Sequence, residues 1–105
     1  MDDLSRRSGG RKAKSVVFTA EQIATRVASL GREITSAYPD GDLVLLGLLK
    51  GSFIFLADLV RAVERPLQVD FLVVSSYGTG TVSSGNVRLL YDPATDLAGK
   101  HIVVV

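Results

Sequence analysis

The sequence predicts an α/β protein built on a parallel sheet, because its segments follow one another in the order that such a sheet requires. Residues 43–49 (LVLLGLL) form a short, uninterrupted apolar run, which is typical of a strand buried on both faces. Residues 52–65 then carry apolar side chains at helical spacing, and residues 67–76 (LQVDFLVVSS) form a second strand-like run. A strand, a helix and a strand in succession match the βαβ unit of a parallel sheet.

A further helix is expected before the first of these strands, from Thr19 to the turn at 38–42 (YPDGD). Thr19 and Gln22 form a capping-box pattern, in which each side chain accepts a hydrogen bond from the backbone N–H of the other residue. Apolar residues then recur at helical spacing, namely Ile23, Val27, Leu30 and Ile34. Gly31 lies within this helix and should weaken it by roughly 1 kcal/mol.

The helix between the two strands is expected to begin near Ser52 and to be stopped by Pro66. Its predicted apolar face consists of Phe53, Leu56, Val60 and Val63, widened by Phe55 and Leu59. After the second strand, residues 77–85 (YGTGTVSSG) combine glycines with hydroxyl side chains, which predicts a mobile loop or a hairpin tip. Further strands are expected at 86–93 and at 101–105.

Length and composition allow a single domain with a modest core, since the chain has 105 residues of which 47% are hydrophobic. Residues 1–15 are expected to form a disordered basic arm and residues 16–105 the folded domain. The arm is rich in arginine, lysine, glycine and serine and has almost nothing to bury. A solvated terminus is the simplest interpretation of this arm, and contact with nucleic acid or acidic lipid is the alternative.

A membrane-spanning helix and a secreted protein are both disfavoured. Residues 43–60 have the length of a membrane span, but Lys50 near the centre and Asp58 would each cost several kcal/mol in hydrocarbon. No apolar segment follows the basic arm as it would in a secretory signal, and the chain contains no cysteine. The expected location is therefore cytoplasmic.

Lys50 and Gly51 give the strongest indication of chemistry. The turn after a buried strand places backbone N–H groups and the positive end of a helix at the carboxyl edge of the sheet, where α/β proteins bind ligands. Lys50 adds a positive charge, so the turn suits phosphate or pyrophosphate, with a solvated lysine as the alternative. The order Lys-Gly is not that of a P-loop. The polar, glycine-containing stretch at 74–85 favours a ligand site, because such loops close over ligands.

Other polar residues give weaker signals. Asp70 lies within an apolar strand and is either edge-facing or part of a buried polar contact. Asp92 precedes a proline, which is typical of a turn, and His101 is interpreted as a surface strand residue rather than a ligand. The sequence contains no carboxylate pair, no Ser/His/Asp set and no cluster with metal-ligand spacing.

Three segments in this order, LLGLLKGSFIFLADLVR, VDFLVVSSYGTGTVSSGNVRLLYD and DLAGKHIVVV, are similar to the hypoxanthine (hypoxanthine-guanine) phosphoribosyltransferases of bacterial type. The similarity runs from about Val16 to Val105 and corresponds to their amino-terminal portion. It implies a type I phosphoribosyltransferase fold, here truncated, with a flexible hairpin-like loop. It also implies a role in purine salvage: transfer of phosphoribosyl from phosphoribosyl pyrophosphate to hypoxanthine or guanine, giving IMP or GMP, with Mg²⁺ as cofactor.

The resemblance also implies roles for individual residues. Pyrophosphate would be bound by Leu49, Lys50 and Gly51, and the Leu-Lys peptide is often cis in this family. The flexible active-site loop is matched by Ser75, Ser76, Tyr77 and Gly78. The family's catalytic base, phosphoribosyl-binding loop and metal-binding aspartate follow the strand matched by residues 101–105. The resemblance therefore implies no catalytic or metal-binding residue in this chain, an inactive chain by itself, and assembly into a homo-oligomer, either a dimer or a tetramer.

Two alternatives to an enzyme remain open. One is a regulatory relative of the phosphoribosyltransferases that binds RNA, which the basic arm supports, although such relatives usually have arginine near the glycine of the turn. The other is a non-catalytic remnant that pairs with a full-length subunit. Under every interpretation the final strand should expose apolar surface, so the isolated 105-residue chain is expected to be poorly soluble or oligomeric.

Overall fold

The computed structural model describes residues 7, 9–11, 13–77, 86–91 and 93–105, so most of the predicted basic arm lies outside the described residues. Two helices and four strands follow one another in the described part. They are α2 (Ala20–Ala37), β1 (Leu43–Leu49), α3 (Phe53–Ala62), β2 (Gln68–Tyr77), β3 (Asn86–Tyr91) and β4 (His101–Val104). The predicted α/β class and the predicted order of elements are confirmed.

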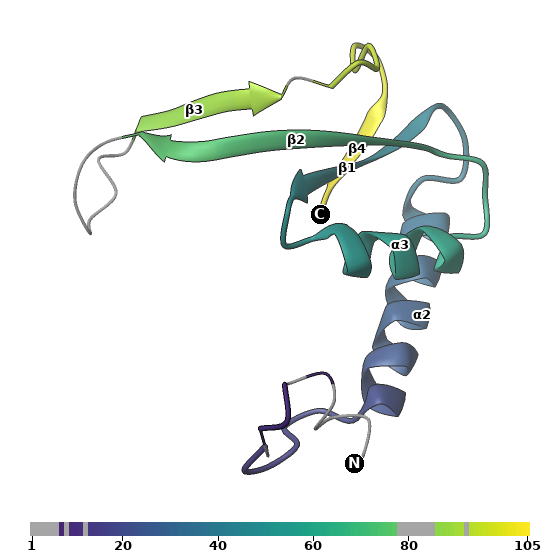
Figure 1. Ribbon diagram of the computed structural model, residues 1–105. Helices are drawn as coiled ribbons and strands as arrows, with labels where there is room; N and C mark the ends of the chain where they lie inside the picture. The colour runs from purple at the N-terminus through teal and green to yellow at the C-terminus, as the bar shows by residue number, and fades with distance from the viewer. Residues whose placement is uncertain (1–6, 8, 12, 78–85, 92) are drawn as a thin grey trace.

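The four strands form one sheet in the order β3-β2-β1-β4 (Figure 1). β1 is central and pairs in parallel with both β2 and β4, while β3 returns antiparallel to β2. In this register Leu46 of β1 lies between Asp70 of β2 and Val104 of β4. The predicted βαβ unit is therefore present, and a hairpin extends it on the β2 side.

α2 begins as the capping-box pattern predicts. The Thr19 N–H donates to Gln22 Oε1 at 2.7 Å, and the Gln22 N–H donates to Thr19 Oγ1 at 3.0 Å. Three of the four residues of the predicted apolar face pack against the core, namely Val27, Leu30 and Ile34. The fourth, Ile23, is 54% exposed and lines grooves that α2 forms with α3.

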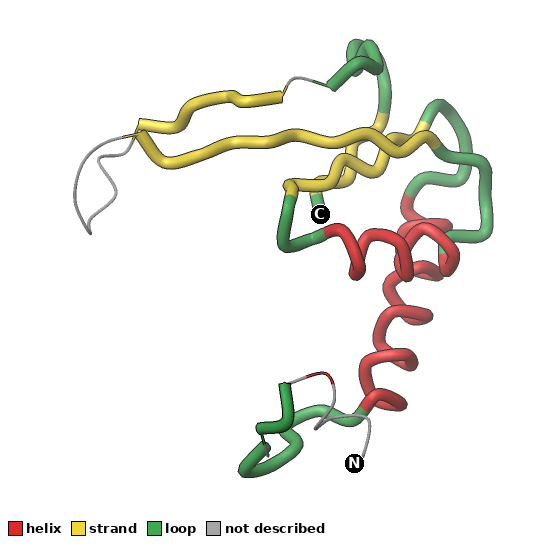
Figure 2. The backbone as a smooth tube through the Cα atoms, viewed as in Figure 1, coloured by secondary structure: helices red, strands yellow, loops and turns green. Residues whose placement is uncertain are grey.

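Gly31 allows α2 and α3 to approach each other closely, which Figure 2 shows as two crossing helices. Gly31 is buried, and a Cβ added to it would lie 2.2 Å from the carbonyl oxygen of Ala62. Any larger residue would push the helices apart. The glycine that lowers helix propensity is therefore required by the packing of the two helices.

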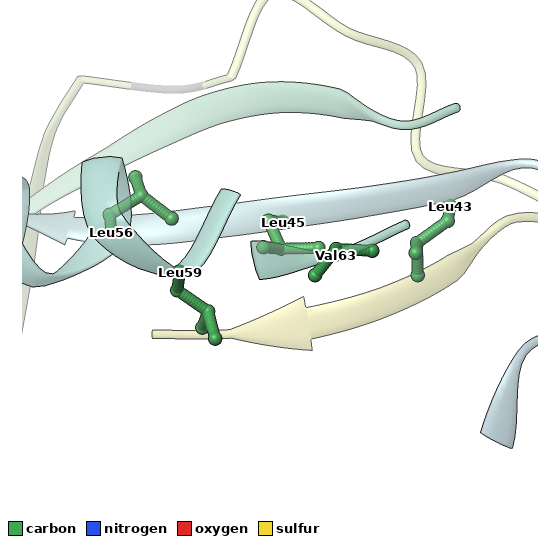
Figure 3. Packing of buried hydrophobic residues seen from close by; sticks show 5 residues of the cluster. All are labelled: Leu43, Leu45, Leu56, Leu59 and Val63. Atoms are coloured by element: carbon green, nitrogen blue, oxygen red, sulfur yellow. The ribbon is translucent and has the colours of Figure 1, made fainter. Parts of the chain in front are cut away.

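The core lies between β1 and α3, where five side chains come together (Figure 3). They are Leu43, Leu45, Leu56, Leu59 and Val63. Burial of each contributes roughly 1.5–3 kcal/mol. On the other face of β1, Val44 and Leu46 are also buried, at 0% and 6% exposure. The prediction of a strand buried on both faces is confirmed for the first part of β1, whereas Leu48 near its end is 37% exposed.

α3 differs from the prediction at both ends. Phe53 and Phe55 are 57% and 41% exposed, so they do not extend the buried face formed by Leu56 and Leu59. A ten-residue helix that packs on one strand buries a single stripe of side chains. The first turn of α3 is not covered by that strand.

The end of α3 is set by tertiary contacts and not by Pro66 as predicted. The helix ends at Ala62, and Val63 already has extended backbone angles (φ −83°, ψ 121°). The Glu64 N–H then donates to Thr35 Oγ1 of α2 at 3.0 Å. This contact, together with burial of the Val63 side chain, takes the chain out of the helix before the proline is reached.

Candidate functional site

The turn at residues 49–51 lies between the end of β1 and the start of α3 (Figure 1). Gly47 lets α3 pack onto β1 just before the turn, since a Cβ there would lie 2.6 Å from Cδ2 of Leu56. The Ser52 hydroxyl donates to the carbonyl oxygen of Leu48 at 2.6 Å. These contacts hold the chain on both sides of the turn and leave the turn itself at the surface.

The backbone of the turn presents a set of hydrogen-bond donors. The peptide between Leu49 and Lys50 is cis, as the family resemblance implied. The N–H groups of Lys50, Gly51 and Ser52 donate to no other residue that the structure describes. The Lys50 carbonyl accepts a bond from the Phe53 N–H at 3.3 Å. Three consecutive donors at the amino end of α3 suit an anionic ligand.

Ser52 was not among the predicted site residues. It is the N-cap of α3, but its side chain makes no capping bond and instead turns back to Leu48. The Ser52 N–H has no acceptor among the described residues and extends the row of donors that begins at Lys50. A serine directly after Lys-Gly at a predicted helix start was the signal that could have indicated it.

The electrostatic surroundings of the turn are positive. The Lys50 side chain is exposed and forms no ion pair within the described part of the chain. The first turn of α3 contains no acidic residue, and the positive end of the helix dipole adds to the field. A Cβ added to Gly51 would have no atom within 4 Å, so the outer side of the turn is open. A groove of about 660 Å³ lies elsewhere, between α2 and α3.

The predicted loop residues lie past the turn on the neighbouring strand. Leu49 pairs with Val73, and β2 continues to Tyr77, which is roughly 13 Å farther along the strand. Three of the predicted residues, Ser75, Ser76 and Tyr77, pair with β3 in this projecting ribbon (Figure 1). The fourth, Gly78, lies outside the described residues.

β4 brings a third chain segment to the same edge of the sheet. The Val105 N–H donates to the carbonyl of Leu46 at 2.8 Å, and the Leu48 N–H donates to the carbonyl of Val105 at 2.9 Å. The carboxyl ends of the parallel strands β1 and β4 therefore lie beside the turn, while β2 runs past it. This edge of the sheet is where open α/β proteins bind ligands.

Asp70 makes the buried polar contact that was one of its two predicted roles. It is 6% exposed, and its carboxylate accepts bonds from the backbone N–H groups of Thr95 and Phe71, each at 2.8 Å. Hydrogen bonds from Thr95, foremost from its side chain, and from the Phe71 N–H hold the pKa of Asp70 below its ordinary value. Asp70 thus ties the segment before β4 to the sheet and does not face the turn.

His101, another weak candidate, lies away from the turn. His101 is exposed at the start of β4, and its ring centroid lies 5.1 Å from that of Tyr38. This position is at the amino edge of the sheet, so the prediction of a surface strand residue is confirmed. Asp92 lies outside the described residues.

The described residues contain no group of three or more His, Cys, Asp or Glu side chains that could hold a metal ion. Mg²⁺ requires oxygen ligands in octahedral geometry and commonly takes some of them from substrate phosphates and water. The turn offers N–H groups and an ammonium group, which do not fit Mg²⁺. Within the same described ranges, no helix is both long and apolar enough to cross a membrane.

Comparison with known sequences gives one family. The phosphoribosyl transferase domain matches residues 15–105. The hypoxanthine-guanine phosphoribosyltransferase of Mycobacterium avium is 49% identical over 98 residues, which cover 88% of this chain and 48% of that protein. The hypoxanthine phosphoribosyltransferase of Escherichia coli K12 is 45% identical over 92 residues, which cover 86% of this chain and 52% of that protein. The chain spans about half the length of the curated relatives it matches.

Comparison with solved structures gives the same family as the sequence comparison. A hypoxanthine phosphoribosyltransferase from Staphylococcus aureus superposes with a TM-score of 0.85 at 33% identity, covering 99% of this chain and 54% of that one. A lysine-to-arginine variant of the Trypanosoma cruzi enzyme, complexed with the product IMP, gives a TM-score of 0.77 at 36% identity over 90% of this chain and 54% of that one. The predicted type I phosphoribosyltransferase fold and the predicted resemblance are confirmed. This chain belongs to the phosphoribosyl transferase domain family, and the relatives named here are hypoxanthine phosphoribosyltransferases.

Proposed function

We propose that this chain carries the pyrophosphate-binding turn of a hypoxanthine (hypoxanthine-guanine) phosphoribosyltransferase that acts in purine salvage in the cytoplasm. The substrates would be phosphoribosyl pyrophosphate and hypoxanthine or guanine, and the products IMP or GMP and pyrophosphate. Residues 16–105 would form the domain that carries the turn, and residues 1–15 a basic arm. The observation that supports this proposal is the row of three N–H groups, those of Lys50, Gly51 and Ser52, which have no acceptor among the described residues and lie at the carboxyl edge of the sheet.

The chemistry of phosphoribosyl transfer explains why such a turn is useful. The bond between the sugar carbon and pyrophosphate breaks as the carbon becomes oxocarbenium-like, so negative charge grows on the departing oxygens. Donors directed at those oxygens stabilise the transition state more than the ground state. In this proposal the N–H groups of Lys50, Gly51 and Ser52 and the Lys50 ammonium hold the leaving pyrophosphate.

The strand ribbon beyond the turn has a separate proposed role. Residues 75–78 begin the segment that would cover the bound substrate and keep water from the reactive sugar carbon. Mg²⁺ is the proposed cofactor of the whole reaction and would accompany the diphosphate. Its protein ligands are not assigned to this chain.

The proposed assembly is a homo-oligomer, a dimer or a tetramer. The support for it is the amount of apolar side chain at the surface, since Phe53, Ile54, Phe55 and Val104 are each more than 40% exposed.

Titration calorimetry with pyrophosphate, with and without Mg²⁺, tests the proposed site on the chain itself. Lys50→Ala should weaken pyrophosphate binding at least tenfold, because it removes the positive charge. It leaves the backbone donors in place. Arg32→Ala is the matched control, since it removes one exposed positive charge from α2 and should leave binding unchanged. Equal losses in both variants would mean that only net charge attracts pyrophosphate. Tight RNA binding without pyrophosphate binding would favour the regulatory relative instead.

A further inference from the structure

Three consecutive apolar side chains directly before α2 lie at the surface. Val16, Val17 and Phe18 are 57%, 79% and 68% exposed, and Ile23 near the start of α2 is 54% exposed. Single apolar side chains on a surface are normal, but a contiguous group of them usually marks a contact surface. The segment lies at the end of α2 that is farther from the sheet (Figure 1), so the described strands do not cover it.

A groove of about 530 Å³ extends this apolar surface along α2. Five of its seven lining residues are apolar, namely Phe18, Ile23, Val27, Leu30 and Phe55. The other two are Gln22, whose side chain is part of the capping box, and Arg26. The Arg26 guanidinium lies 3.5 Å from the Glu33 carboxylate, and both side chains are 61% exposed, so the pairing is weak. A positive charge that is only weakly neutralised therefore lies beside the apolar side chains.

The chain that leads into this surface is basic. Between residues 4 and 20 the sequence has five arginine or lysine residues and no acidic one. Lys14, the last of the five, is exposed and lies two residues before Val16. Exposed apolar side chains next to a run of cations are typical of segments that lie on anionic membranes, with the apolar groups at the acyl boundary and the cations among the headgroups.

A nucleic acid would match the positive charge but not the apolar side chains. Proteins contact phosphates mainly with lysine and arginine, and they stack unpaired bases on aromatic rings. Phe18 is the one aromatic residue in the exposed apolar group, so an RNA would leave most of that group in water. A lipid surface matches both features, because it offers anionic headgroups and hydrocarbon side by side.

We propose that the surface formed by Val16, Val17, Phe18 and Ile23, together with the basic residues that precede it, binds this chain to an anionic membrane. The apolar side chains would enter the boundary between headgroups and acyl chains, while the Lys14 ammonium stays among the headgroups. The contact is peripheral, since four apolar side chains are far fewer than a spanning helix requires. The inference does not depend on the proposed phosphoribosyl transfer, because none of these residues belongs to the turn at 49–51.

Vesicle sedimentation tests the proposal directly. The full chain should sediment with vesicles of phosphatidylcholine and phosphatidylserine in a ratio of about two to one, but not with phosphatidylcholine alone. Raising the ionic strength from about 0.1 M to about 1 M shortens the screening length from about 10 Å to about 3 Å and should release most of the chain. Binding to neither kind of vesicle, or equal binding to both, overturns the proposal. Binding to single-stranded RNA without binding to vesicles overturns it in favour of a nucleic acid.

A matched pair of valine variants tests the apolar part of the contact. Val17→Asp should weaken vesicle binding at least tenfold, because it places a carboxylate at the acyl boundary. Val104→Asp makes the same change at a residue 60% exposed on β4 and should leave vesicle binding unchanged. Both side chains are exposed, so circular dichroism should show both variants folded. Equal losses in the two variants overturn the proposal.

A second matched pair tests the electrostatic part. Lys14→Gln should weaken vesicle binding about fivefold, which is the contribution expected of one cation near an anionic surface. Arg32→Gln removes the same charge from an exposed position on α2 that does not line the groove, and it should change vesicle binding less than twofold. Equal losses would mean that only net charge attracts the chain, which overturns the proposed surface.

Phe18→Trp reports directly on insertion, since the chain contains no other tryptophan. Tryptophan is favoured at membrane interfaces, so this variant should bind vesicles as the wild-type chain does. Its emission should shift to shorter wavelength with the anionic vesicles and should be quenched by lipids with brominated acyl chains. A shift without quenching would mean that the residue is covered by protein and not by lipid, and it would overturn the proposal.

Discussion

The two edges of the parallel sheet carry similar short connections, but the hydrogen bonding of their backbone groups differs. Backbone carbonyls are paired at the amino edge, whereas N–H groups at the carboxyl edge have no partner in the described part of the chain. At the amino edge, the turn that leads into β1 has three carbonyls that accept bonds from one guanidinium group. Arg65 donates to Tyr38 at 2.5 Å, to Asp40 at 3.2 Å and to Gly41. At the carboxyl edge, the turn at residues 49–51 has N–H groups without a partner in the described part of the chain.

The amino edge is closed further by β4. The His101 N–H donates to the carbonyl of Asp42 at 2.9 Å, and the His101 ring lies over Gly41 and Tyr38. Gly41 has a positive φ of 79°, where a side chain would be strained and would also lie 3.2 Å from the imidazole. Polar backbone groups in folded proteins are normally paired. The contrast indicates that the amino edge stabilises the fold, and it supports the proposal that the carboxyl edge binds a ligand.

Arg65→Ala should have the largest effect on stability. It leaves carbonyls of the 38–42 turn without their donor and should lower the free energy of unfolding by about 2 kcal/mol. Arg65→Lys should recover only part of this loss, because an ammonium group cannot match the planar guanidinium fork. Urea denaturation followed by circular dichroism measures both values. Equal stability of the wild-type and Arg65→Ala chains would contradict a stabilising amino edge.

Lys50→Ala should lower the affinity for pyrophosphate while leaving the stability of the fold nearly unchanged. The exposed Lys50 side chain makes no hydrogen bond or ion pair with the described residues, so its removal should change the free energy of unfolding by less than about 0.5 kcal/mol. The expected tenfold loss of pyrophosphate affinity corresponds to about 1.4 kcal/mol of binding free energy. Denaturation and calorimetry on the same preparation give the two numbers. A large loss of stability would mean that the turn belongs to the structural part of the molecule.

Ser52→Ala should affect folding more than binding. It removes the hydrogen bond to Leu48 and should cost about 1 kcal/mol of stability, but it keeps the backbone N–H that is proposed to bind pyrophosphate. Pyrophosphate affinity should therefore fall by less than threefold. If affinity instead falls as far as in Lys50→Ala, the hydroxyl rather than the N–H contacts the ligand.

Asp70 should give the smallest effect, and one that depends on pH. Because its pKa is lowered in the folded state, its stabilising contribution is present above the unfolded pKa of about 4 and is lost as the pH falls through the folded value. The melting temperature of the wild-type chain should thus fall more between pH 5 and pH 3, roughly the range around that pKa, than that of Asp70→Asn. Parallel curves for the two chains would show that Asp70 does not contribute.

Local patterns predicted much of the fold because their causes are local. The capping box at Thr19 depends on residues three apart, and the buried strand at residues 43–49 depends on a continuous apolar run. The turn at Lys50 follows from the boundary between that strand and the next helix. The exposure of Phe53 and the early end of α3 could not be predicted in this way, since both depend on which elements lie opposite the helix.

The sequence by itself determined the order of strands and helices, the place of the Lys-Gly turn and the family resemblance, because periodicity, turn residues and motifs are all written in neighbouring positions. Only the tertiary structure decided that Gly31 is needed for the contact of two helices, that Asp70 binds Thr95, and that Arg65 closes the amino edge. These interactions join residues 25 to 31 positions apart in the chain. Their partners are chosen by packing in three dimensions, and no local pattern carries that information.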